Sequence, residues 1–202
     1  MVRMLSERAR RFLDRCERTT AVPTADVERI LRAGGWPTAP AWLEFHDRYA
    51  GCVERISRDA AVWGLVHEDS FWFGPRRAEV DTDEDDEDRL FIYCAELHPA
   101  YGYRLDTAGR FLAYGQEASS FDVHVERLAV WREFTAGRQT HKIVDEERLR
   151  DPEYRAELLA RLGERPIPEA SDGNFAWYAD EETLVEDDIR RGYLSSVLLR
   201  RS

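Results

Sequence analysis

The sequence predicts an α+β fold in which N-terminal helices precede a central, mostly antiparallel sheet of about five to six strands, followed by packing helices. Three observations predict this class. Apolar residues recur at helical spacing through residues 5–49, β-branched and aromatic runs alternate with turn residues through 60–114, and helical spacing returns after residue 120. With 202 residues and 43% apolar content, the chain can bury one sizeable core.

The first helix is expected from residue 5 onward. Its apolar stripe consists of Leu5, Ala9, Phe12, Leu13 and Cys16. The opposite face is mostly Arg and Glu, so two interpretations stay open: a helix docked on the domain, or an arm that seeks a partner.

Two short amphipathic helices are predicted next, on either side of a Gly-Gly-Trp-Pro elbow. Thr24 and Thr38 are expected to cap them, and Pro40 suits a first turn, where a missing N–H costs nothing. Gly34-Gly35 and Gly51 are expected to end them. Their buried faces are Val27, Ile30 and Leu31 in the first helix, and Trp42, Phe45 and Tyr49 in the second.

The middle of the chain predicts strands at residues 60–66, 71–73, 89–97, 101–105 and 110–114. The first two are expected to pair as a hairpin, and the third to be central because it is apolar on both faces. The last two flank Asp106-Thr107-Ala108-Gly109, a turn in which Asp can bond its own backbone and Gly can take positive φ.

Further helices are predicted after Ser120, with a buried stripe that includes Phe121 and Trp131, and after Asp151-Pro152, where Asp caps the helix. A short helix is expected from Glu181 to Arg190 and a terminal strand from Tyr193 to Leu199. The expected organisation is one α+β domain over residues 1–138 and an extension over residues 139–202 that packs on it. The pattern does not decide whether the extension continues the same sheet.

Glu79 to Asp88 is chemically the most unusual segment, with eight carboxylates and no cation. Mutual repulsion predicts an exposed loop, which is either a solvated surface or a docking site for a basic protein. The spacing of Asp81, Asp83 and Asp85 resembles a calcium loop, but Asp86 and Ile92 stand where the turn Gly and the bidentate Glu are needed, so no metal site is expected. The predicted partner-binding residues here are Asp83, Glu84, Asp85, Asp86, Glu87 and Asp88.

Tryptophans supply the other predicted contacts. Trp36, Trp42, Trp63 and Trp131 fall on apolar faces and are expected in the core. Trp72 and Trp177 lie in less regular surroundings, so they are predicted to be exposed anchors for a partner.

No catalytic constellation is recognisable. There is no HExxH, no G-x-S-x-G and no phosphate-binding glycine loop, and the H-x-E at His124 lacks a P-C-x-x-C. We therefore expect no catalytic residue and no cofactor, although an enzyme site assembled from distant residues stays an alternative.

Charge and cysteine content indicate the compartment and the partner. A net charge of −11 disfavours nucleic acid and anionic membranes as partners and favours a basic protein. Three separated cysteines, the absence of a signal peptide and the absence of a membrane-spanning run predict a cytoplasmic protein.

Several of these motifs, read in order from Thr24 to Gly137, resemble the SUKH superfamily. Its opening signature is matched by Pro40, Trp42, Phe45, Tyr49 and Gly51, although Ala39, Ala50 and Cys52 differ from it. The Asp-x-x-Gly turn and the Ser-Phe start of a Leu-Trp helix resemble its later segments. This resemblance implies an immunity protein that binds and neutralises a toxin, often a nuclease, or alternatively an intracellular regulatory scaffold, which would use Trp177 and its neighbours.

Overall fold

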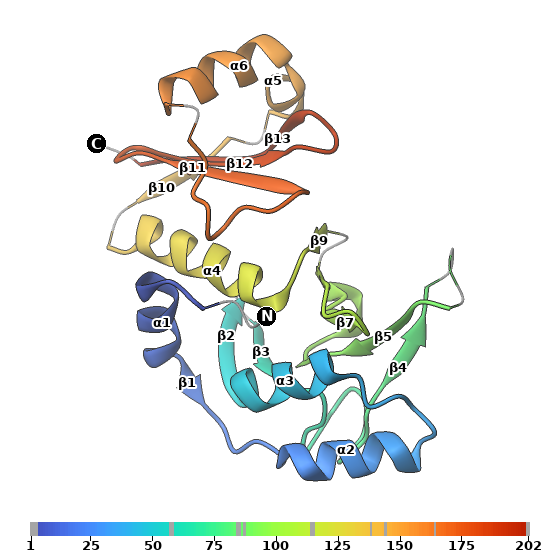
Figure 1. Ribbon diagram of the computed structural model, residues 1–202. Helices are drawn as coiled ribbons and strands as arrows, with labels where there is room; N and C mark the ends of the chain where they lie inside the picture. The colour runs from blue at the N-terminus through green and yellow to red at the C-terminus, as the bar shows by residue number, and fades with distance from the viewer. Residues whose placement is uncertain are drawn as a thin grey trace. The chain divides into compact units, whose positions relative to one another are not determined.

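The computed structural model describes residues 4–56, 59–83, 86, 88–113, 116–137, 139–143, 145–163 and 165–200. They form two compact units (Figure 1), an N-terminal unit within residues 13–121 and a C-terminal unit within residues 1–12 and 122–202. The α+β class and the helix-first order are confirmed. In place of one central sheet, the described strands form three antiparallel sheets of four, five and four strands. A domain division at residue 138 stays a prediction.

The N-terminal unit contains two of these sheets. One has the order β1-β2-β3-β6 and the other the order β4-β5-β7-β8-β9. The elements are β1 (Glu17–Arg18), α2 (Thr24–Ala33), α3 (Pro40–Tyr49), β2 (Cys52–Ile56), β3 (Asp59–Trp63), β4 (Val80–Thr82), β5 (Leu90–Tyr93), β6 (Ala95–Glu96), the 3-10 helix η1 (Pro99–Tyr101), β7 (Arg104–Asp106), β8 (Phe111–Ala113) and β9 (Gln116–Ala118).

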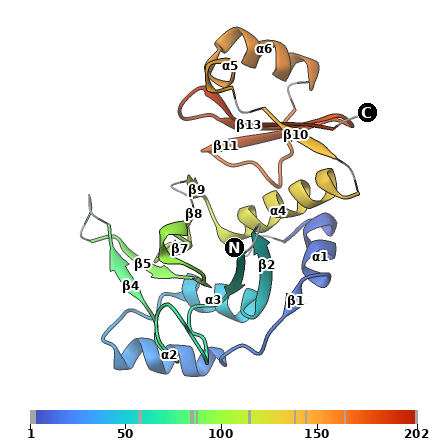
Figure 2. The ribbon, with the colours of Figure 1, turned by 180° about the vertical axis from the view of Figure 1, so that it is seen from behind.

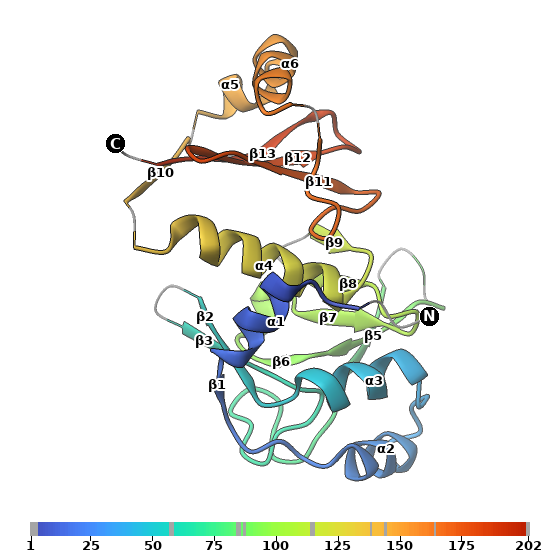
Figure 3. The ribbon, with the colours of Figure 1, turned by 60° about the vertical axis from the view of Figure 1, so that its left-hand side comes forward.

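Helices α2 and α3 lie side by side where the sequence predicts them (Figure 3). Their predicted caps are wrong, because the N-cap residues are Pro23 and Ala39 and neither helix has a side-chain cap. Thr24 already lies within α2, and its hydroxyl donates to Asp47 at 3.3 Å instead. The predicted ends are confirmed, and Gly51 takes a φ of 83°.

Phe121 is at the centre of the aromatic core of this unit. Its ring lies 4.6 Å from Phe45, 5.0 Å from Tyr49, and 4.9 Å from both Trp63 and Phe111, measured between centroids. These rings come from α3, β3, β8 and the start of α4 (Phe121–Thr135). The predicted burial of the α3 face is therefore confirmed, and the buried rings hold helix and strands together.

Two strand predictions differ from the structure. β3 pairs with β2, not with residues 71–73, and the long strand predicted over 89–97 is divided at Cys94 into β5 and β6. The Cys94 carbonyl accepts from the N–H of Gly64, which follows β3, while its own N–H donates to the carbonyl of Tyr103, which precedes β7, both at 3.0 Å. Its backbone thus bonds to residues that adjoin strands of both sheets. The turn at Asp106 is confirmed, since its carboxylate accepts the N–H groups of Ala108 and Arg110.

The C-terminal unit is a sheet with helices on both faces (Figures 1 and 3). Helices α5 (Glu146–Arg150) and α6 (Pro152–Arg161) cover one face and α4 the other. The sheet order is β10-β13-β12-β11, so the strands of the C-terminal third form a sheet of their own. These strands are β10 (Thr140–Lys142), β11 (Phe175–Ala179), β12 (Thr183–Asp188) and β13 (Tyr193–Arg200).

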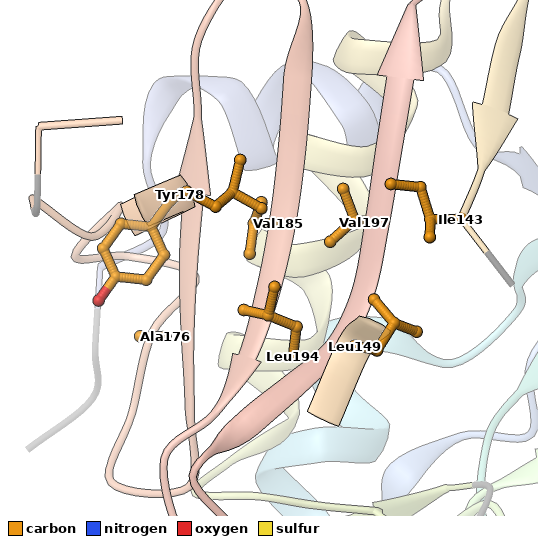
Figure 4. Packing of buried hydrophobic residues seen from close by; sticks show 8 residues of the cluster. Ile143, Leu149, Ala176, Tyr178, Val185, Leu194 and Val197 are labelled. Carbon is orange, nitrogen blue, oxygen red and sulfur yellow. The ribbon is translucent and has the colours of Figure 1, made fainter. Parts of the chain in front are cut away.

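The helix predicted from Glu181 to Arg190 is wrong, because most of that stretch is β12. Val185 points into the cluster beneath α5 and α6 (Figure 4), whereas Leu184 belongs to the cluster against α4. Neighbouring residues thus bury opposite faces, which a strand between two helix layers achieves. The terminal strand and the Asp151 cap of α6 are confirmed.

The N-terminal helix α1 (Glu7–Asp14) is docked, as one of the two interpretations expects. The buried carboxylate of Glu126 on α4 accepts both the N–H and the hydroxyl of Ser6, each at 2.6 Å. The Ser6 hydroxyl in turn accepts the Ala9 N–H at 3.1 Å, and Ala9 is fully buried. These bonds tie the first turn of the helix to α4.

Candidate protein-binding surface

An aromatic loop, residues 67–76, follows β3 and is held by one carboxylate. Glu96 on β6 accepts the Ser70 hydroxyl at 2.6 Å, the Phe71 N–H at 2.8 Å and the Trp72 N–H at 3.2 Å. The Ser70 hydroxyl also accepts the Phe73 N–H at 2.9 Å. Three successive backbone donors are therefore satisfied by side chains, which is why residues 71–73 form a loop and not the predicted strand.

The end of this loop is clamped by Arg76. Its N–H donates to the His67 carbonyl at 2.7 Å, and its guanidinium pairs with Glu68 at 2.7 Å and with Asp26 of α2 at 2.7 Å. Hydrogen bonds from Arg29 and Arg76 lower the pKa of Asp26. Arg76 has a φ of 51°, uncommon for a residue with a side chain, and such a backbone persists only where its surroundings hold it.

The fixed loop presents its rings to solvent. Phe71 is 83% exposed and Trp72 is 43% exposed, so the predicted exposure of Trp72 is confirmed. The two rings are perpendicular, with centroids 4.9 Å apart, and Trp72 also contacts His98 at 4.5 Å. Tyr101 extends the row, with its centroid 6.5 Å from His98 and its hydroxyl donating to Asp59 at 2.8 Å. We call Phe71, Trp72, His98 and Tyr101 the aromatic surface.

The buried side chain of His46 contacts the chain just before the aromatic loop. His46 of α3 accepts the Leu65 N–H at Nδ1, 3.1 Å away, so its proton is on Nε2, which donates to the Val22 carbonyl at 2.7 Å. Burial lowers the pKa of His46 and also that of His67, whose Nε2 lies 3.1 Å from the Gly64 carbonyl. The neutral form of His46 is therefore the one that joins α3 to Leu65, two residues before the loop.

Part of the predicted acidic loop lies in a strand pair. Residues 80–82 form β4, which pairs with β5 as a hairpin (Figure 2). Asp83 is half-buried, and its carboxylate lies 3.5 Å from Arg89, which also pairs with Asp106 at 3.2 Å and Glu117 at 3.3 Å. Asp86 and Asp88 are exposed. Glu84, Asp85 and Glu87 lie outside the described residues.

Negative charge and exposed rings share one segment of the chain. Residues 59–101 contain twelve carboxylates and three arginines, whereas the net charge of the whole chain is −11. Most of the charge excess therefore belongs to the segment that carries the aromatic surface and the hairpin of β4 and β5, which we call the acidic hairpin. The partner-binding role of the six acidic residues and of Trp72 stays a prediction.

The prediction that Trp177 is an exposed anchor is wrong, because it is only 6% exposed and packs in the cluster against α4. Its strand, β11, is covered at the edge: the Trp177 carbonyl accepts the Ile167 N–H at 2.6 Å, and its N–H donates to the Ser171 hydroxyl at 2.9 Å. The segment that supplies these groups precedes the strand and closes over it.

Trp36 is the opposite case, predicted buried but 39% exposed. Its indole packs over Gly34, the C-cap of α2, where an added Cβ would lie 2.8 Å from the ring. Trp36 also lines a cleft of about 320 Å³ with Ile30 and residues 76–80. The two arginines of this cleft are paired with carboxylates.

Two of the cysteines, Cys52 and Cys94, are buried. Burial raises the pKa of the Cys52 thiol and, more strongly, that of Cys94, which opposes thiolate formation. Within the described ranges, no three His, Cys, Asp or Glu side chains are placed to hold a metal ion. No helix in the same ranges has the length and apolar character needed to cross a membrane.

Sequence reasoning missed Phe71, Ser70 and Glu96 as site residues. Gly74-Pro75, directly after the three aromatic residues, is a turn signal that could have indicated a loop there. Nothing in the sequence identifies Glu96 as the acceptor, because it lies more than twenty residues along the chain from the groups it binds.

No protein-family model matches this chain, and neither a curated protein nor a solved structure shows a match to it.

Proposed function

We propose that this protein acts by binding a basic protein, without catalysis, and that it neutralises that partner as an immunity protein neutralises its toxin. One observation carries the proposal. The Glu96 carboxylate fixes the backbone of residues 70–72 so that Phe71 and Trp72 project into solvent from the most acidic segment of the chain.

Exposed rings on a fixed loop favour association. Burying an aromatic side chain contributes about 1.5–3 kcal/mol, and Phe71 has most of its surface left to bury. A loop already held in place loses less conformational entropy on binding than a loose one. Tryptophan is also enriched among the residues that dominate binding energy in protein interfaces.

The carboxylates of the same chain segment favour a cationic partner. Asp86 and Asp88 on the acidic hairpin are exposed and add to the negative charge of this segment. Charge complementarity raises the association rate and suppresses wrongly charged partners, and its effect decreases with salt.

The resemblance to the SUKH superfamily supports the immunity role, through Pro40, Trp42, Phe45, Tyr49 and Gly51 on and after α3. Of these, Trp42, Phe45 and Tyr49 are buried in the core, so the shared residues are ones that build a fold. The binding residues are expected to differ between such proteins, because function depends on the site more than on the fold. The regulatory-scaffold alternative would use the C-terminal third through Trp177 and its neighbours. Trp177 is buried, so this residue does not support that alternative.

The test is co-expression of the product of the adjacent gene with the wild-type protein and with a Phe71→Ala/Trp72→Ala variant. We expect the wild type to copurify with that product and to restore growth, and the variant to lose both. Ile189→Ala is the matched control, because Ile189 is a 46% exposed apolar residue of the C-terminal unit. Wild-type behaviour of the double variant, or equal loss with Ile189→Ala, would contradict the proposal.

A further inference from the structure

We infer that the aromatic surface and Asp69 form a receptor for an arginine side chain of the protein partner. The inference rests on the proposed function and specifies which group of the partner is bound. The guanidinium would stack on the exposed ring of Phe71 with an edge toward Trp72, while Asp69 accepts its N–H groups.

The rings offer an accessible aromatic face to a planar cation. Phe71 and Trp72 are perpendicular, with centroids 4.9 Å apart, so together they form a corner of two aromatic faces. An aromatic ring carries negative charge on its faces, and a cation within about 6 Å of the centroid is attracted to it. The 83% exposure of Phe71 leaves its ring open to such a contact.

Asp69 supplies a carboxylate on the same loop as the rings. It is exposed, it precedes Phe71 by two residues, and it forms no ion pair with any residue that the structure describes. The adjacent Glu68 shows the contrast, because both of its oxygens accept from Arg76, at 2.7 and 3.0 Å. The loop thus already binds one guanidinium of its own chain and leaves a second acceptor free.

These features favour arginine over lysine. A guanidinium is planar, weakly hydrated and able to stack on a ring while its N–H groups pair with a carboxylate. An ammonium is a compact, strongly hydrated charge that gains little from stacking. General negative charge would attract arginine and lysine equally. A preference for arginine would therefore be caused by the aromatic rings.

The test compares two peptides of equal charge, nona-arginine and nona-lysine, by titration calorimetry at fixed salt. We expect the wild type to bind nona-arginine about two- to fivefold more tightly, the effect of one exposed cation–π contact. Phe71→Ala/Trp72→Ala should remove this preference without weakening nona-lysine, and Asp69→Asn should reduce it. Ile189→Ala should retain it. Equal affinity for the two peptides, including absence of binding by both, or a preference that survives the double variant, overturns the inference.

The two proposals can fail separately. If the peptides bind equally while the double variant still loses the adjacent gene product, arginine recognition is refuted and the proposed function stands. If the arginine preference follows the rings while the adjacent gene product is not bound, the inferred receptor is supported and the proposed partner is refuted.

Discussion

Replacing Glu96 with alanine tests whether the aromatic loop is preorganised. The substitution removes the acceptor of three hydrogen bonds, from the Ser70 hydroxyl and from the N–H groups of Phe71 and Trp72, and leaves both rings in the chain. The two N–H groups are exposed and can bond to water, so we expect a global destabilisation of only about 1–2 kcal/mol.

The larger effect is expected on binding. Immobilising a flexible side chain at an interface costs about 0.5–1.5 kcal/mol, and a loosened loop must order both rings, so affinity for the protein partner should fall about tenfold. Glu96→Gln is the graded variant, because its amide oxygen can still accept the two N–H groups while the second acceptor oxygen is lost.

The assay that needs no partner is amide hydrogen exchange. In Glu96→Ala, exchange at Phe71 and Trp72 should accelerate while amides of β12 in the C-terminal unit keep their wild-type rates. Unchanged exchange at the two loop amides would refute the reasoning, because it would mean that Glu96 does not hold the loop.

Three further predictions concern stability. Burial lowers the pKa of His46, so the unfolded chain binds a proton more readily than the folded protein does. The stability contributed by neutral His46 is therefore fully present above the unfolded pKa of about 6.5 and is lost as pH falls below it. The melting temperature should therefore decline from pH 7 to pH 5.5, and less steeply in His46→Gln; parallel profiles would contradict this. Gly51→Ala should cost about 2 kcal/mol or more in urea unfolding, because its φ is 83° and the added Cβ would clash with the carbonyl oxygen of Thr19. Gly35→Ala, with a φ of 77° but open space around it, should cost about 1 kcal/mol, and equal costs would exclude the clash as the cause. Glu126→Ala should destabilise the chain by about 2 kcal/mol in urea unfolding by releasing the N-terminal helix at Ser6, whereas an unchanged midpoint would show that these hydrogen bonds contribute nothing.

Elements set by contacts between near neighbours were predictable from the sequence. The turn at Asp106 forms because its carboxylate reaches N–H groups two and four residues away, and α6 begins where Asp151 accepts the Glu153 N–H. The apolar faces of α2 and α3 followed from their spacing in the same way. Of the candidate site, the sequence indicated the acidic segment and the exposed ring of Trp72.

Other features depend on contacts between groups far apart in the chain, so only the tertiary structure decided them. β12 is a strand because two helix layers bury Leu184 and Val185 on its opposite faces. The sequence alone predicts a helix over this stretch. Trp177 is buried because a preceding segment covers its strand. Residues 71–73 form a loop with exposed rings because Glu96 binds the backbone of Phe71 and Trp72. A sequence records which donors and acceptors a residue carries, whereas its distant partners are chosen only when the packed chain brings them within hydrogen-bonding distance.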